Sequence, residues 1–101
     1  MKAIFVMSER FSSFLSNGDE ANVFRFTEVE PALSRREEIV FDFSGVTNMT
    51  TSFANGLVAT LLAHHPEEFT RLVRFQNCDP VVKTILLGAI ALGRKEHSSF
   101  V

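Results

Sequence analysis

The sequence predicts an α/β domain whose β-sheet is largely parallel. Three short segments have the length and composition of strands: Ala3–Met7, Ile39–Phe43 and Arg71–Phe75. Segments with the periodicity of amphipathic helices lie between and after them. Because strands that alternate with helices need crossover connections, this order favours parallel pairing, with the first strand or two open to antiparallel pairing.

The composition is that of one ordinary globular domain covering residues 1–101, and its 46% hydrophobic content is enough to form a core. The formal net charge is −2 and no basic stripe is present, so we expect no nucleic-acid partner. The single cysteine, Cys78, excludes an intramolecular disulfide. No apolar stretch approaches the roughly 20 residues that cross a bilayer, so we expect a cytoplasmic protein without a membrane partner.

The N-terminal third begins with the strand Ala3–Met7. Phe11–Leu15 is either a second strand, paired with the first as a hairpin, or an irregular edge. Asn17-Gly18 indicates a turn, and the acidic residues after it suit the first turn of a helix over Glu20–Arg36. Pro31 lies inside this helix and lacks a backbone donor, so the helix is either kinked there or divided into two pieces.

The middle of the chain contains the strongest strand, Ile39–Phe43, whose nearly continuous apolar residues are typical of a central strand covered on both faces. Apolar residues at helical spacing over Ser52–His65 predict a second long helix, which Pro66 ends. Charged residues along the helices, Glu30 among them, are interpreted as solvated faces with i, i+4 pairs.

The C-terminal part continues with Arg71–Phe75, where polar and apolar residues alternate as in a half-buried strand. A third helix begins at Asp79-Pro80, with the aspartate as N-cap and the proline at the first helical position. Gly93 is suited to end this helix, and residues 92–101 are predicted to be mostly tail.

The junction between the central strand and the second helix carries the candidate site. Three consecutive hydroxyl residues, Thr50, Thr51 and Ser52, stand where the helix begins. In open α/β sheets the carboxyl end of a strand joining a helix N-terminus is a frequent functional location. The hydroxyls are open to three roles: capping and loop solvation, a regulatory phosphoacceptor or partner contact, and a catalytic nucleophile whose general base is unassigned.

Other polar residues fit structural roles better than chemical ones. Asp42, near the end of the central strand, is expected to hydrogen bond to loop amides within residues 45–47. His64 and His65 are adjacent, so they do not share a metal ion as an i, i+4 pair would. Cys78 suits a small buried residue at a strand–helix corner. We therefore expect no metal site and no cofactor.

Two passages resemble STAS domains, the fold of anti-sigma-factor antagonists. In the first, Asp42-Phe43-Ser44-Gly45-Val46 is similar to the family's Asp-Leu-Ser-Gly-Val, and Met49-Thr50-Thr51-Ser52-Phe53 to its apolar-Asp-Ser-Ser-Gly loop. The second, VRFQNCDPVVKTIL, is similar to a strand, an N-x-x-P-x-V motif and a helix. The Ser52-Phe53 pair is most similar to a STAS-like family of unknown function. The resemblance covers Glu37–Leu92 well and the N-terminal third loosely.

This resemblance implies a STAS-like fold, with about four strands in a mixed, mostly parallel sheet and about three helices packed mainly on one face. It also implies a partner switch. In STAS antagonists a loop serine is phosphorylated by a serine kinase of the histidine-kinase ATPase fold, and the dephosphorylated form binds that kinase and displaces a regulatory client. By position Thr51 matches the phosphorylated serine and Ser52 the residue after it, while Asp42, Ser44, Gly45 and Phe53 hold structural positions of the loop.

The chain departs from that motif on both sides of the phosphoacceptor position. Thr50 replaces the family's Asp, and Phe53 replaces its Gly with a bulky ring where a kinase would need close access. We therefore expect the loop to be a partner-contact surface, with phosphorylation of Thr51 or Ser52 left open.

The sequence thus leads to the hypothesis of a non-enzymatic, STAS-like regulatory interaction module. Because this chain carries no ATPase motif, its partner would be a separately encoded serine-kinase-type ATPase or a similar regulator. The alternative is a small-ligand or nucleotide sensor that uses the same helix N-terminus as an anion site.

Overall fold

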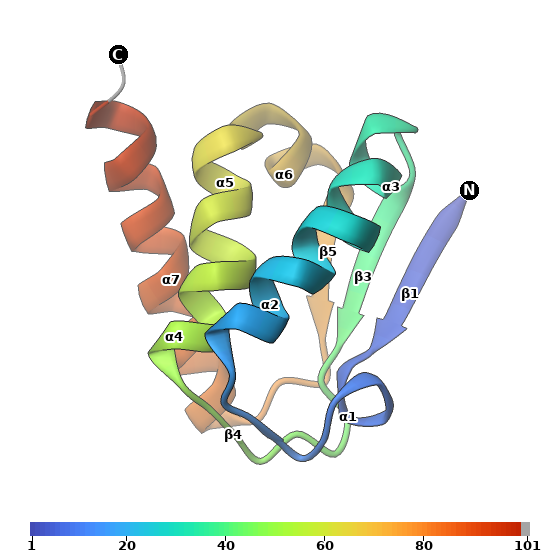
Figure 1. The fold of residues 1–101 in the computed structure, drawn as a ribbon, viewed down its shortest axis with the longest axis vertical. Helices are drawn as coiled ribbons and strands as arrows, with labels where there is room; N and C mark the ends of the chain where they lie inside the picture. The colour runs from blue at the N-terminus through green and yellow to red at the C-terminus, as the bar shows by residue number, and fades with distance from the viewer. Residues whose placement is uncertain (100–101) are drawn as a thin grey trace.

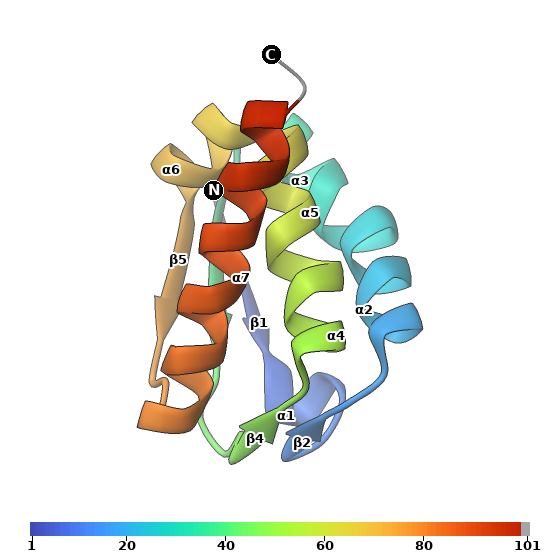
Figure 2. The same ribbon diagram turned by 90° about the vertical axis from the view of Figure 1, so that its left-hand side faces the viewer.

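A three-stranded parallel sheet forms one layer of the molecule and the long helices form the other (Figure 1). The structure is a computed structural model that describes residues 1–99. Strands β1 (Lys2–Val6), β3 (Glu38–Asp42) and β5 (Val73–Gln76) pair in the order β1-β3-β5. Each begins within two residues of its predicted position, so the three principal strand predictions are confirmed. Figure 2 shows the sheet on one side and the long helices on the other.

A second, smaller sheet pairs β2 (Phe14–Leu15) with β4 (Asn48–Met49), also in parallel. The prediction of a single mixed sheet of about four strands is therefore wrong in this detail, and so is the hairpin between Ala3–Met7 and Phe11–Leu15. The short helix α1 (Met7–Arg10) follows β1 directly and turns the chain away from the sheet. Every paired strand is separated from its partner by helices, which imposes parallel pairing.

Within residues 1–99 the helical residues form five continuous segments rather than about three. One of them is α1. Two are long helices that each contain a wide π-helical stretch, the fourth is a short helix, and the fifth is a long C-terminal helix. Their bounds are α2 (Gly18–Phe24) with η1 (Arg25–Val29) and α3 (Glu30–Ser34), α4 (Thr51–Ala54) with η2 (Asn55–Ala59) and α5 (Thr60–His64), α6 (Pro66–Leu72), and α7 (Pro80–Ser99).

Pro31 neither breaks nor divides its helix, because the preceding turn is widened. The amide of Glu30 donates to the carbonyl of Arg25, the five-residue spacing of a π-helix. The widened turn accommodates Pro31, which has no N–H to donate to the turn before it. The helix thus runs continuously from Gly18 to Ser34.

The C-terminal third contains two features that the sequence did not predict. Helix α6 follows Pro66 at once, so the proline starts a helix as well as following one. Gly93 does not end α7, which continues to Ser99, so residues 92–99 are helix rather than tail, and residues 100–101 lie outside the described part. Gly93 is instead a packing residue, since a Cβ there would lie 2.7 Å from the carbonyl oxygen of Ala59.

The core lies between the sheet and the helices. Phe5, Phe41 and Phe75 lie in register across the three strands, and the central ring of Phe41 is fully buried. The helices cover only this face, yet β3 is buried on both, since Val40 on the opposite face is only 5% exposed. On the opposite face Val40 lies between its strand neighbours Ile4 and Arg74, and Ile4 is 55% exposed.

Two glycines of α7 provide a matched test of this packing. A Cβ at Gly88 would meet no atom within 4 Å, whereas one at Gly93 would crowd the backbone of Ala59. Gly88→Ala should raise the free energy of unfolding by about 0.5–1 kcal/mol through helix propensity. Gly93→Ala gains the same propensity but overpacks the contact, which costs about 1–3 kcal/mol. Urea denaturation should therefore find it less stable than Gly88→Ala, and equal stabilities would contradict the close approach of α5 and α7.

Candidate functional site

Asp42 fixes the first end of the loop that leads from β3 to α4. Its Oδ1 accepts from the amide of Ser44 at 2.9 Å, from the Ser44 hydroxyl at 2.7 Å and from Asn77 Nδ2 at 3.0 Å. The hydrogen bond from Asn77, with those from Ser44, lowers the pKa of Asp42 to about 2. The expected bonding to loop amides is thus confirmed in kind, but the amide belongs to Ser44 rather than to residues 45–47.

Gly45 makes the turn that follows. Its φ of +80° is a conformation that residues with a Cβ rarely adopt, and a Cβ there would lie 3.1 Å from the hydroxyl of Ser8. Val46 is buried, whereas Thr47 and Asn48 are exposed. The amide of Thr47 donates to the carbonyl of Ser13 at 2.8 Å, which attaches the loop to the segment after α1.

Thr50 is the N-cap of α4, so the capping role predicted for one of the three hydroxyls is confirmed. Its Oγ1 accepts from the amide of Phe53 at 3.1 Å and donates to the carbonyl of Ser16 at 3.1 Å. Its own amide donates to the carbonyl of Leu15 at 2.9 Å. The first two bonds occupy the side chain, and the bonds to Ser16 and Leu15 attach the helix start to residues 15–16.

Ser52 and Thr51 differ in what surrounds them. The Ser52 hydroxyl lies against Gly18, at the start of α2, so closely that a Cβ on Gly18 would overlap it. Thr51 is exposed, and its hydroxyl forms no hydrogen bond with any residue of the described chain. Thr51 and Ser52 are thus both exposed, and Ser52 is the one whose hydroxyl also contacts the start of α2.

Phe53 points into the core and is fully buried. Its ring packs edge-to-face on Phe11, with the ring centroids 5.2 Å apart. The expectation that this ring crowds the surface next to Thr51 is therefore wrong. Residue 53 contributes to the site by anchoring the start of α4 to the loop after α1.

The family of this domain follows from a comparison of its sequence with family models. A sequence model of the family described as "STAS-like domain of unknown function (DUF4325)" matches residues 20–83, which include the loop, the helix over 51–64 and most of the helix over 18–34. The chain belongs to this STAS-like family. No match was found among curated proteins or among solved structures.

The STAS-like domain contains a polar network that the sequence did not reveal. Arg25 donates to Glu30 at 2.8 Å, to Asn22 at 2.6 Å and to the carbonyl of Gly56, and His65 Nε2 lies 3.1 Å from Glu30. Burial raises the pKa of Glu30, but the bonds from Arg25 and His65 outweigh it and hold the pKa below its usual value. Glu30 is thus an inter-helix partner rather than part of a solvated face.

This network escaped prediction because its spacing is not α-helical. Arg25 and Glu30 are five residues apart and meet only because η1 is a π-helical stretch.

Cys78 is only partly buried, and this burial raises the pKa of its thiol. Among the described residues, no group of three or more His, Cys, Asp or Glu side chains could hold a metal ion. No helix formed by residues 1–99 has the length and apolarity needed to cross a membrane.

The role of Asn77 can be tested by replacing it with glycine. Asn77 has a φ of 59°, which glycine adopts without strain, so Asn77→Gly removes the amide donor and keeps the backbone. The pKa of Asp42 should then rise from about 2 toward its ordinary 3.8, as measured by NMR titration of its carboxyl group. Arg36→Gly is the matched control, since Arg36 also has a positive φ, of 60°, and forms no bond to Asp42.

The same variant should change how stability depends on pH. A carboxyl group with a lowered pKa in the folded state stabilises the fold at neutral pH, and this contribution is lost as the pH falls from 3.8 to about 2. Asn77→Gly should therefore lose less stability over that interval than the wild type does. An unchanged Asp42 titration would show that Asn77 does not hold the carboxylate.

Proposed function

We propose that this STAS-like domain is a non-enzymatic regulatory interaction module, which binds a protein partner through the loop of residues 47–52. The partner that best fits the resemblance is a separately encoded ATPase of the histidine-kinase fold, of the serine-kinase type. The observation that carries the proposal is the contrast among the three hydroxyls. Thr50 caps α4 and the Ser52 hydroxyl, although exposed, lies against Gly18, whereas the exposed Thr51 forms no hydrogen bond within the described residues.

The surroundings of Thr51 favour a protein contact. The adjoining β2–β4 pair places Phe14 opposite Asn48, and Phe14 is 49% exposed. Exposed Ser12, Ser13, Thr47 and Asn48 surround it with uncharged polar groups. An exposed aromatic ring among small polar side chains is typical of the anchor residue of a protein interface.

The start of α4 is less suited to a free anion. The amide of Phe53, one of the groups without a helical partner, already donates to the Thr50 side chain. Fewer amide groups are therefore left to bind a phosphate than at an uncapped helix N-terminus. This favours the interaction module over the alternative of a nucleotide or small-ligand sensor.

A phosphate on Thr51 would act on the contact rather than on the fold. It would add about −1.5 to −2 charge on an exposed side chain. Since the Thr51 hydroxyl forms no bond in the described chain, modifying it would break none. The partner interface would have to bury this charge or would repel it, so the phosphate would weaken partner binding. Binding would then be switched without refolding of the domain.

The test is a binding titration against a histidine-kinase-fold ATPase, chosen as the one co-encoded with this chain where the genome contains one. Thr51→Asp should weaken binding by about tenfold or more, because it places an unpaired charge in the interface. Thr51→Ala should bind like the wild type. Phe14→Ser should also weaken binding, through loss of the aromatic anchor.

Thr70→Asp is the matched control, because Thr70 is an exposed threonine on α6, at the opposite end of the molecule from α4 (Figure 1). It should leave the affinity unchanged. The proposal fails if the wild type does not bind the ATPase, or if Thr51→Asp binds as tightly as Thr51→Ala.

A calorimetric titration with ATP and GTP separates the two functional classes. The interaction module predicts no heat of binding to this chain alone, since the amides that would hold a phosphate are partly occupied by Thr50. Saturable heat that disappears in Thr51→Asp would instead assign the helix start to a nucleotide.

A further inference from the structure

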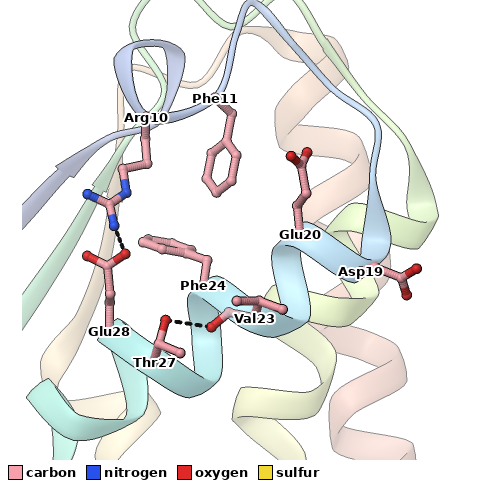
Figure 3. Close-up of a pocket in the computed structure, with 8 residues that line it drawn as sticks. All are labelled: Arg10, Phe11, Asp19, Glu20, Val23, Phe24, Thr27 and Glu28. Carbon is pink, nitrogen blue, oxygen red and sulfur yellow. Dashed lines mark hydrogen bonds and ion pairs between the residues drawn. The ribbon is translucent and has the colours of Figure 1, made fainter.

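A second surface of the domain combines a pocket, exposed apolar side chains and free carboxylates. The pocket has a volume of about 380 Å³ and lies between the loop after α1 and the outer side of α2 (Figure 3). Its walls are Phe11 and Phe24, whose rings meet edge-to-face at 5.3 Å, together with Val23. Figure 3 shows Arg10 and Glu28 on one side of these rings and Glu20 on the other.

The apolar surface continues along α2 beyond the pocket. Val23 is 61% exposed and Phe26 is 70% exposed. Val23 lines the pocket, and Phe26 lies three residues further along the same helix, at the start of its π-helical stretch. An exposed valine and phenylalanine beside an aromatic pocket form a larger apolar area than a small ligand in that pocket would cover.

The charges around this surface are mainly negative. Asp19 and Glu20 are exposed and form no ion pair with any residue of the described chain. Glu28 pairs with Arg10, whose guanidinium also lies 5.3 Å from the centre of the Phe24 ring. The guanidinium of Arg10 therefore lies between an aromatic ring and a carboxylate, and it interacts favourably with each of them.

We propose that this acidic–apolar surface, formed by Asp19, Glu20, Val23, Phe26 and the Phe11–Phe24 pocket, binds a basic amphipathic segment of a protein partner. One apolar side chain of the segment enters the pocket beside Val23, and a second covers Phe26. Its arginine or lysine residues pair with Asp19 and Glu20. The surface adjoins the proposed loop interface, since Phe11 and Glu20 also line a neighbouring pocket with Phe14, but it is centred on α2 and goes beyond the proposed function.

Charge complementarity selects this occupant over a second copy of the chain. A copy would bring the same carboxylates toward each other in a two-fold contact, and like charges at an interface are repulsive. A basic segment with apolar residues at i, i+3 and i+7 meets both the carboxylates and the apolar stripe.

The probe is a synthetic 15-residue helical peptide, with leucine on one face and arginine on the other, compared with a twin that has glutamine in place of arginine. The arginine peptide should shift the NMR signals of Val23, Phe26 and Phe11 and bind more tightly than the glutamine twin. Its affinity, measured by fluorescence anisotropy, should fall as salt rises.

Two variants remove the charge and the apolar anchor separately. The double variant Asp19→Asn and Glu20→Gln should lower the affinity for the arginine peptide about fivefold and leave the affinity for the glutamine twin unchanged. Phe26→Ser should lower the affinity for both peptides about tenfold. Glu67→Gln, which removes an exposed carboxylate from α6, is the matched control and should change neither affinity. Thermal unfolding of each variant confirms that it is folded.

The proposal is overturned if the arginine peptide does not bind, or if the glutamine twin binds equally well. It is also overturned if the peptide shifts NMR signals of the domain outside this surface instead of those of Val23, Phe26 and Phe11. Sedimentation of the wild type as a dimer that Phe26→Ser dissociates would assign the surface to a second copy and also overturn it. Thr51→Asp should not change peptide affinity, and Phe26→Ser should not change ATPase binding. Failure of this proposal is therefore distinguishable from failure of the proposed function.

Discussion

The packing of Phe41 at the centre of the sheet is the constraint on which the rest of the domain depends. Its ring stacks between Phe5 and Phe75 and contacts Phe24 of α2. From Phe24 the aromatic contacts continue to Phe11 and then to Phe53 in the first turn of α4. The loop that presents Thr51 is therefore positioned by a continuous chain of phenylalanine rings that begins in the sheet.

The sequence predicted those elements whose signals are local. The apolar run that became β3 and the Asp79-Pro80 helix start lie where expected, because strand pattern and capping act over a few residues. Gly93 was mistaken for a helix end because a glycine needed for close packing and one needed for a C-cap are identical in sequence. The two-residue strands β2 and β4 exist only through pairing between distant segments, which no local pattern encodes.

The same distinction holds for the candidate site. A hydroxyl cap at the start of α4 was predictable, as was a hydrogen-bonding role for Asp42. Which hydroxyl lies against α2 depends on how α4 is rotated against it, as the contact between Ser52 and Gly18 shows. Whether Phe53 faced solvent or the core was likewise set by Phe11, 42 residues earlier in the chain. These are tertiary relations between residues that no periodicity connects.

The contact between the two long helices bears on how a switch at Thr51 would work. Arg25, in the π-helical stretch of one helix, donates to the carbonyl of Gly56 in the π-helical stretch of the other. Gly56 itself allows the approach, since a Cβ there would lie 3.1 Å from the carbonyl oxygen of Gly18. The two helix starts are thus held together at Ser52 and again at Gly56. Close-packed interiors resist small continuous shifts, so a charge added at Thr51 would change what a partner meets rather than where the helices lie.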